Sequence, residues 1–195
     1  AVVAARRAEV YARGEPKKVF DLASLVVGIR MSEYAVLARS QQLTNDDRER
    51  IVAQITDEMS RVARTQDELP IALQVKAHVL YWKFALLRKD AGEQAFHLGR
   101  ALELDDADPE LNVIIARNEL TAGRSKAALE ALDRSIDAGR ANIVILNEAV
   151  GILKQRGELG RARELWQMGM TMPAKSPDDA QALEALSHQF RQGGS

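Results

Sequence analysis

Three histidines, His78, His97 and His188, are the side chains of this 195-residue chain whose ordinary pKa lies nearest neutral pH. Their spacing fits no metal motif, such as two histidines four residues apart on one helix. His78 and His97 fall on two neighbouring predicted helices and could meet across them. We expect packed or surface histidines, and the pattern predicts neither a metal site nor a cofactor.

The carboxylates follow structural rather than catalytic patterns. Asp105, Asp106 and Asp108 stand before Pro109, but the glycine and the distal glutamate of a calcium loop are missing. We therefore expect a turn and a helix cap there. Residues 157–160 (GELG) lack the lysine of a phosphate-binding loop. Since no catalytic residue is predicted, we expect a chain that is not an enzyme but could be fused to one.

Composition limits the partners and the compartment. A net charge of −1 and an aromatic content of 5% argue against nucleic-acid binding, which uses basic surfaces and stacking rings. The absence of cysteine excludes disulfides and thiolate metal sites. No apolar run reaches the roughly 18 residues of a membrane span. Arginine outnumbers lysine, which hints at a bacterial source. We expect the cytoplasm and leave the periplasm open.

The second half of the chain repeats itself with a period of 34 residues. The matched pairs are Gly123 and Gly157, Ala128 and Ala162, Leu132 and Trp166, and Ser135 and Gly169. A turn glycine followed at helical spacing by small and large apolar residues is typical of repeated helix pairs. Plentiful alanine, leucine, arginine and glutamate also favour helix. The sequence therefore predicts an all-α fold.

This pattern resembles the tetratricopeptide repeat, a helix–turn–helix unit of 34 residues. The stretch 101–109 (ALELDDADP) looks like the end of that family's second helix and the turn into the next repeat. The resemblance implies a right-handed α-solenoid of antiparallel helix pairs over residues 71–176. Its three repeats would cover about 75–108, 109–142 and 143–176.

The first repeat departs from the family pattern at its turn. Lys89 stands where the later repeats have glycine, and Gln94 stands where they have the first small residue. Ala95 supplies a small residue one place late, so we expect the turn there to be reshaped. The glycine of the family's first helix is also absent, and its places are taken by Trp82, Ala116 and Val150.

Residues 1–70 do not follow the 34-residue frame but are predicted to form a helical segment packed on the solenoid. A short helix over 1–14 precedes a helix from about Pro16 to Ser40 that is apolar nearly all round. We expect this second helix to be a central core helix, buried on more than one side. The polar and acidic residues from Thr44 onward predict the start of an amphipathic helix.

The chain ends in a predicted capping helix over residues 177–192 and a flexible tail over 193–195. Ser176 is a suitable cap, and Pro177 suits the first turn of a helix. A terminal solenoid helix shields the last repeat on one side and meets water on the other. The apolar spacing of Leu183, Leu186 and Phe190 fits that role.

In this family the ligand usually lies in a concave groove lined by the first helix of each pair. The resemblance places these candidate residues there: Lys76, Lys83, Arg117, Asn147 and Lys154. Such a mildly basic strip could bind an acidic or C-terminal peptide through charge-assisted hydrogen bonds. The alternative is a set of solvating residues on an exposed face.

The expected function is a non-catalytic scaffold that binds a protein or peptide in the solenoid groove. The alternative is a regulatory or positioning domain of a larger enzyme, such as a glycosyltransferase, or of a secretion or assembly complex. A third hypothesis is a homo-oligomer built through the apolar helix over residues 16–40.

Overall fold

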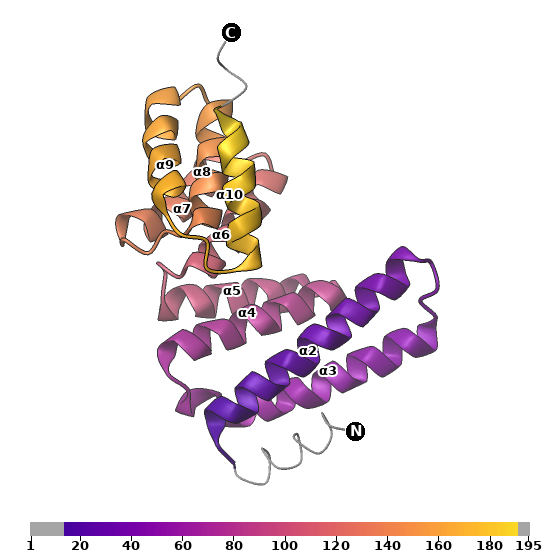
Figure 1. Cartoon of the computed structure of the whole chain (residues 1–195). Helices are drawn as coiled ribbons and strands as arrows, with labels where there is room; N and C mark the ends of the chain where they lie inside the picture. The colour runs from indigo at the N-terminus through magenta and orange to yellow at the C-terminus, as the bar shows by residue number, and fades with distance from the viewer. Residues whose placement is uncertain (1–13, 191–195) are drawn as a thin grey trace. The chain divides into compact units, whose positions relative to one another are not determined.

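A computed structural model describes residues 14–190 of the chain, and every regular element in that range is helical. The all-α prediction is therefore confirmed. The chain divides into two compact units, Ala1–Leu104 and Asp105–Ser195 (Figure 1). This division places residues 71–104 with the N-terminal helices. In the described part of the chain, no helix combines the length and the apolar character that crossing a bilayer requires.

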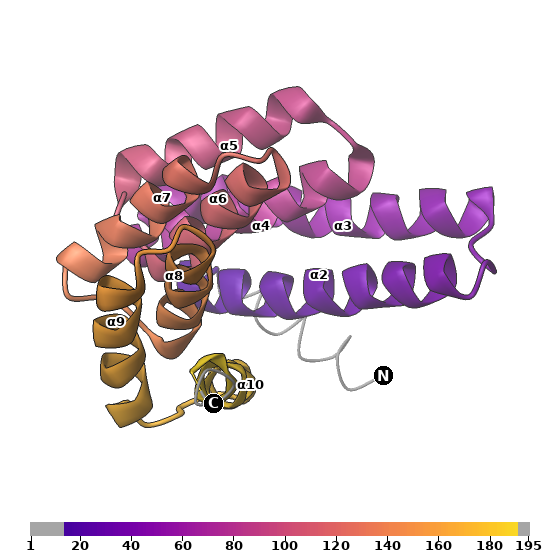
Figure 2. The ribbon, with the colours of Figure 1, turned by 90° about the horizontal axis from the view of Figure 1, so that it is seen from above.

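Among residues 14–104, the first unit forms two helix pairs. Its elements are α2 (Pro16–Arg39), α3 (Asn45–Thr65), the 3₁₀ turn η1 (Gln66–Glu68), α4 (Ile71–Arg88) and α5 (Ala91–Leu104). Helix α2 packs along α3, and α4 packs along α5 (Figure 2). Two apolar clusters hold the unit: one includes Phe20, Val62 and Ala77, the other Val27, Ile55 and Phe84.

Helix α3 begins and packs as its sequence predicts. The Thr44 hydroxyl accepts a hydrogen bond from the Asp47 backbone N–H at 3.1 Å, which caps the first turn. The predicted apolar stripe is buried: Ile51, Ile55, Met59 and Val62. Glu58 is fully buried beside that stripe, which the sequence pattern did not predict.

Helix α2 is a core helix in its first half only. Val19, Phe20 and Val27 are buried, but Ile29 and Val36 are 48% and 63% exposed. The prediction of a helix buried on more than one side is therefore wrong for the second half. The physical reason is that α2 packs mainly on α3, so its opposite face has few neighbours among the described residues.

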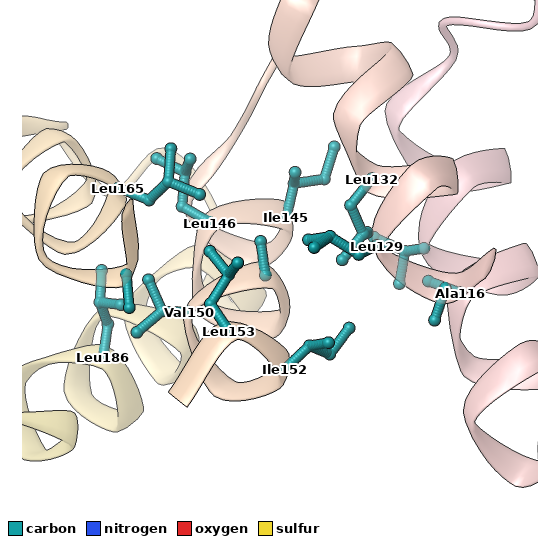
Figure 3. Close-up of a cluster of buried hydrophobic side chains, with 14 of the residues drawn as sticks. Ala116, Leu129, Leu132, Ile145, Leu146, Val150, Ile152, Leu153, Leu165 and Leu186 are labelled. Atoms are coloured by element: carbon teal, nitrogen blue, oxygen red, sulfur yellow. The ribbon is translucent and has the colours of Figure 1, made fainter. Parts of the chain in front are cut away.

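Between residues 105 and 190 the second unit forms five helices: α6 (Pro109–Thr121), α7 (Ser125–Asp137), α8 (Ile143–Gln155), α9 (Leu159–Thr171) and α10 (Pro177–Gln189). Helix α6 pairs with α7 and α8 pairs with α9, while α8 also meets α7 and α10. One apolar cluster joins them. Figure 3 shows Ile145 of α8 pointing toward Leu132, whereas Val150 lies toward Leu186 of α10.

The turn inside each helix pair has the same geometry three times, at intervals of 34 residues. Lys89, Gly123 and Gly157 all have positive φ angles, of 58°, 74° and 76°. At each turn this residue donates its N–H to the carbonyl three residues back, and the next residue donates to the carbonyl five back. The prediction of a reshaped turn at Lys89 is therefore wrong, because lysine adopts the left-handed conformation that glycine adopts later.

Small residues occupy the predicted buried positions of the second helices. Ala128 and Ala162, one period apart, are both fully buried. Ala101 and Ser135 are also fully buried. At the matching Gly169, a Cβ atom would lie 2.4 Å from Cδ2 of Leu186, so α10 approaches α9 where a side chain is missing.

The helix predicted over residues 177–192 is present as α10 over most of that length. The Ser176 hydroxyl accepts from the Asp179 N–H at 3.0 Å, and Pro177 is the first helical residue. The helix packs on α8 and α9 and ends at Gln189. The predicted helix over residues 1–14 and the predicted tail over 193–195 lie almost wholly outside the described residues, and the solenoid arrangement stays a prediction.

Candidate functional site

His78 of α4 and His97 of α5 meet, as their places on neighbouring helices predicted. Their Nδ1 atoms are 3.0 Å apart. On the far side of His78, its Nε2 lies 2.8 Å from the amide nitrogen of Gln66. On the far side of His97, its Nε2 lies 3.1 Å from a carboxylate oxygen of Glu93. The two rings thus form the middle of a four-residue chain of polar contacts.

The partners at the two ends fix the direction of this chain. A carboxylate only accepts, so His97 donates from Nε2 to Glu93 and keeps a lone pair on Nδ1. His78 then donates from Nδ1 to His97, and its Nε2 accepts from the Gln66 amide. Both rings are neutral in this arrangement, and every ring nitrogen has a partner. Neither ring has a free lone pair with which to act as a general base.

Burial and the partners lower the pKa of both histidines. Burial lowers the pKa of His78 to about 4, and the neighbouring His97 and Arg100 act in the same direction. Burial also lowers the pKa of His97, although the Glu93 carboxylate opposes that shift. The geometry agrees, because a proton added to His78 Nε2 would face the Gln66 amide donor. The interpretation as packed histidines fits His78, whose exposed fraction is 7%.

A hollow of about 240 Å³ lies beside His97 between α3, α4 and α5. Its apolar walls include Met59, Tyr81 and Phe84. The Tyr81 ring stacks on His97 with centroids 4.7 Å apart, and its hydroxyl donates to the Met59 carbonyl at 2.9 Å. Burial raises the pKa of Tyr81 to about 12, so this phenol stays protonated. The polar lining residues are Thr56, Ser60, Arg88, Glu93 and His97.

Three of the predicted groove residues lie in the second unit, where other residues of the unit engage them. Arg117 of α6 donates to a carboxylate oxygen of Glu148 on α8, at 2.8 and 3.0 Å. Asn147 of α8 accepts from the Gln189 side-chain amide at 3.1 Å through its backbone and side-chain oxygens. Lys154 donates to the Gln189 carbonyl and lies 5.0 Å from the Phe190 ring centre. Residues at the end of α10 therefore already contact two of the three predicted groove residues, Asn147 and Lys154.

The other two predicted groove residues, Lys76 and Lys83, lie on α4 in the first unit. Lys76 is exposed and Lys83 is partly buried. Arg117 belongs to the second unit, so a strip that joins these lysines to it stays a prediction.

The acidic cluster before α6 is a structural turn, as predicted. Asp108 accepts from the Leu111 N–H at 2.9 Å, which caps α6. Asp105 pairs with Arg140 through two contacts of 2.7 Å. Between residues 14 and 190, no three acidic or histidine side chains gather in a way that could hold a metal ion.

Comparison with known proteins adds no family to this description. No family model, curated protein or solved structure matches the chain. The resemblance to tetratricopeptide repeats therefore rests on the sequence pattern alone, that is, on the 34-residue period and the stretch 101–109.

Sequence reasoning found the histidine pair but missed its surroundings. The spacing of Glu93 and His97, four residues apart on one predicted helix, was a usable signal for their contact. Gln66 gave no such signal, because it lies in the short connection between α3 and α4. The hollow was not predictable either, since three helices must be placed before a gap between them can be seen.

Proposed function

We propose that this chain is a non-catalytic helical scaffold that binds a segment of another protein. The observation that carries the proposal is the hollow of about 240 Å³ beside His97, bounded by three helices of the first unit. The three helices that bound the hollow pack on one another within the first unit. A preformed site of this kind loses little entropy when it binds a peptide.

The size of the hollow favours one side chain of a peptide over a cofactor. Sites for small molecules usually measure about 300–1,000 Å³, so the hollow lies below that range. Its walls are formed by Met59, the Tyr81 ring and the Phe84 ring, which suit an apolar or aromatic side chain. Methionine adapts its shape to such a guest at low cost.

The polar groups at the hollow suit the backbone and flanking residues of the same peptide. Arg88 and Glu93 both line the hollow, and they carry opposite charges. Arg88 also pairs with Asp90 at 2.9 Å, which holds its side chain in place. The Thr56 and Ser60 hydroxyls bond backbone carbonyls one turn earlier in α3, at 2.9 and 2.8 Å. An apolar anchor with polar neighbours is the usual plan of a peptide-binding site.

The test is to select peptides from a random dodecapeptide library displayed on phage, using the full chain as bait. Ala63 is an exposed residue of α3 that lines the hollow, so Ala63→Trp fills the hollow without disturbing the core. Ala53→Trp is the matched control, because Ala53 is an exposed alanine of the same helix that does not line the hollow. We expect selected peptides to lose binding to Ala63→Trp and to keep it with Ala53→Trp.

The predicted groove is tested with the same peptides. Lys83→Glu combined with Arg117→Glu reverses two charges of that strip and leaves the hollow intact. If this variant loses binding while Ala63→Trp keeps it, the site is the groove and not the hollow. If no peptide binds the unaltered chain above background, the proposed function is wrong.

A further inference from the structure

Helix α2 carries an exposed apolar stripe along its outer face. Leu25, Ile29 and Val36 are 55%, 48% and 63% exposed. At 100° per residue they fall within about 40° of one another around the helix, and Ser32 lies about 20° to one side of Leu25. The spacing from Leu25 through Ile29 and Ser32 to Val36 is four, three and four residues, which is the seam spacing of paired helices.

A glycine stands in the middle of this helix, and no contact among residues 14–190 requires it. Gly28 lies near the same face, and a Cβ atom added there would meet nothing within 4 Å. Glycine in a helix interior costs about 1 kcal/mol relative to alanine. Ser32 lies one turn later and donates its hydroxyl to the Gly28 carbonyl at 2.9 Å, so its polar group is satisfied. Small residues four apart let a second helix approach closely.

The charges at the two ends of the stripe make it complementary to itself. Asp21 lies at one end and Arg39 at the other, both exposed and both on the same side as the stripe. In an antiparallel pair of α2 helices centred on residue 30, Asp21 of each copy lies opposite Arg39 of the other. In the same register Gly28 faces Ser32, which places the small residues at the crossing.

We propose that two copies of this chain associate through antiparallel pairing of their α2 helices. A two-fold interface presents the same patch twice, so it requires this kind of self-complementary pattern. The paired stretch from Asp21 to Arg39 is about 27 Å long at 1.5 Å per residue. One helix face of that length falls in the class of small interfaces, below about 1,200 Å², so the dimer is weak and depends on concentration.

The first test is sedimentation equilibrium of the full chain from about 1 μM to about 300 μM, which spans the range expected for weak association. We expect a monomer–dimer equilibrium. Ile29→Glu should raise the dimer Kd on the order of tenfold or more, because it places a charge in the apolar seam. Leu86→Glu on α4 is the matched control, since Leu86 is 51% exposed and should leave the Kd unchanged. A monomer at every concentration, or equal effects of both variants, would overturn the proposal.

The second test addresses the antiparallel register. Asp21→Arg and Arg39→Asp should each raise the dimer Kd about three- to tenfold, because each places like charges opposite one another twice. An equimolar mixture of the two variants should recover dimers, since each copy then supplies the charge that the other needs. In a parallel dimer residue 21 faces residue 21 and residue 39 faces residue 39, so each replacement exchanges one like-charged pair for another and leaves the Kd about unchanged. Single variants that dimerise as well as the unaltered chain therefore rule out the antiparallel register, and so does a mixture that stays as weak as its components. Circular dichroism and melting of each variant confirm that it is folded.

Discussion

The helix pair α4–α5 in the first unit and the pairs α6–α7 and α8–α9 in the second share one backbone frame but fill it differently. At the same place in the frame, Ala128 and Ala162 are fully buried, whereas Gln94 is partly exposed. The second unit fills its frame with one continuous apolar cluster. The first unit instead buries His78 and leaves a hollow beside His97. The helix pairs therefore share a backbone geometry, and the side chains at equivalent positions determine whether a pair forms a continuous apolar core or borders a hollow.

The largest expected effect compares one frame position in all three pairs. Ala128→Trp and Ala162→Trp should each lower the free energy of unfolding by about 3 kcal/mol or more, because no space exists for the ring. Gln94→Trp should cost less than about 1 kcal/mol, since its place is partly exposed. Urea denaturation of the three variants checks this order. Equal losses in all three would show that both units pack this position alike.

Gly169 and Gly99 give the next comparison, at two helical glycines of different surroundings. Gly169→Ala should cost about 1–2 kcal/mol, because the new Cβ would meet the fully buried Leu186 at 2.4 Å. Gly99→Ala in α5 should gain up to about 1 kcal/mol, because nothing lies within 4 Å of its Cβ and alanine favours helix. Thermal melting should thus move in opposite directions. A gain at Gly169 would mean that α10 does not pack as closely as described.

The polar interior of the first unit should make its stability depend on pH. Burial lowers the folded-state pKa of His78 from 6.5 to about 4, so the unfolded chain binds a proton first as the pH falls. The free energy of unfolding is therefore unaffected by this group above pH 6.5 and decreases as the pH falls from 6.5 toward 4. Urea denaturation at several pH values across this window measures the slope.

A matched pair of variants assigns that slope to the histidine pair. Replacing both histidines, His78→Gln with His97→Gln, should flatten the decrease. His188→Gln is the control, because His188 is exposed on α10 in the second unit. A slope that survives the double replacement but disappears with His188→Gln would place the pH dependence in the other unit.

The sequence predicted those features that depend on contacts between residues close together in the chain. The helices and their caps at Thr44, Asp108 and Ser176 depend on neighbours within one turn, so local sequence is sufficient. The small residues of the second helices were also predictable, because the 34-residue repeat places a small residue at the same position in more than one helix pair.

The failures concern contacts that no local rule contains. The exposed second half of α2 was not predictable, because the apolar residues of one helix do not determine how many other helices pack against it. The engagement of Asn147 and Lys154 by the end of α10 depends on residues 35 to 42 positions away. The hollow beside His97 likewise depends on three helices at once.

The smallest change in the free energy of unfolding is predicted for the turns within the helix pairs. Lys89 has a φ of 58°, a conformation that costs a residue with a side chain roughly 1 kcal/mol relative to glycine. Lys89→Gly should therefore raise the free energy of unfolding by up to about 1 kcal/mol, and Gly123→Lys should lower it by a similar amount. Urea denaturation of both single variants measures the two changes. Opposite and similar changes are expected because the two turns share their hydrogen bonds. A loss of stability on Lys89→Gly would instead show that the lysine side chain contributes an interaction that the later turns do not have.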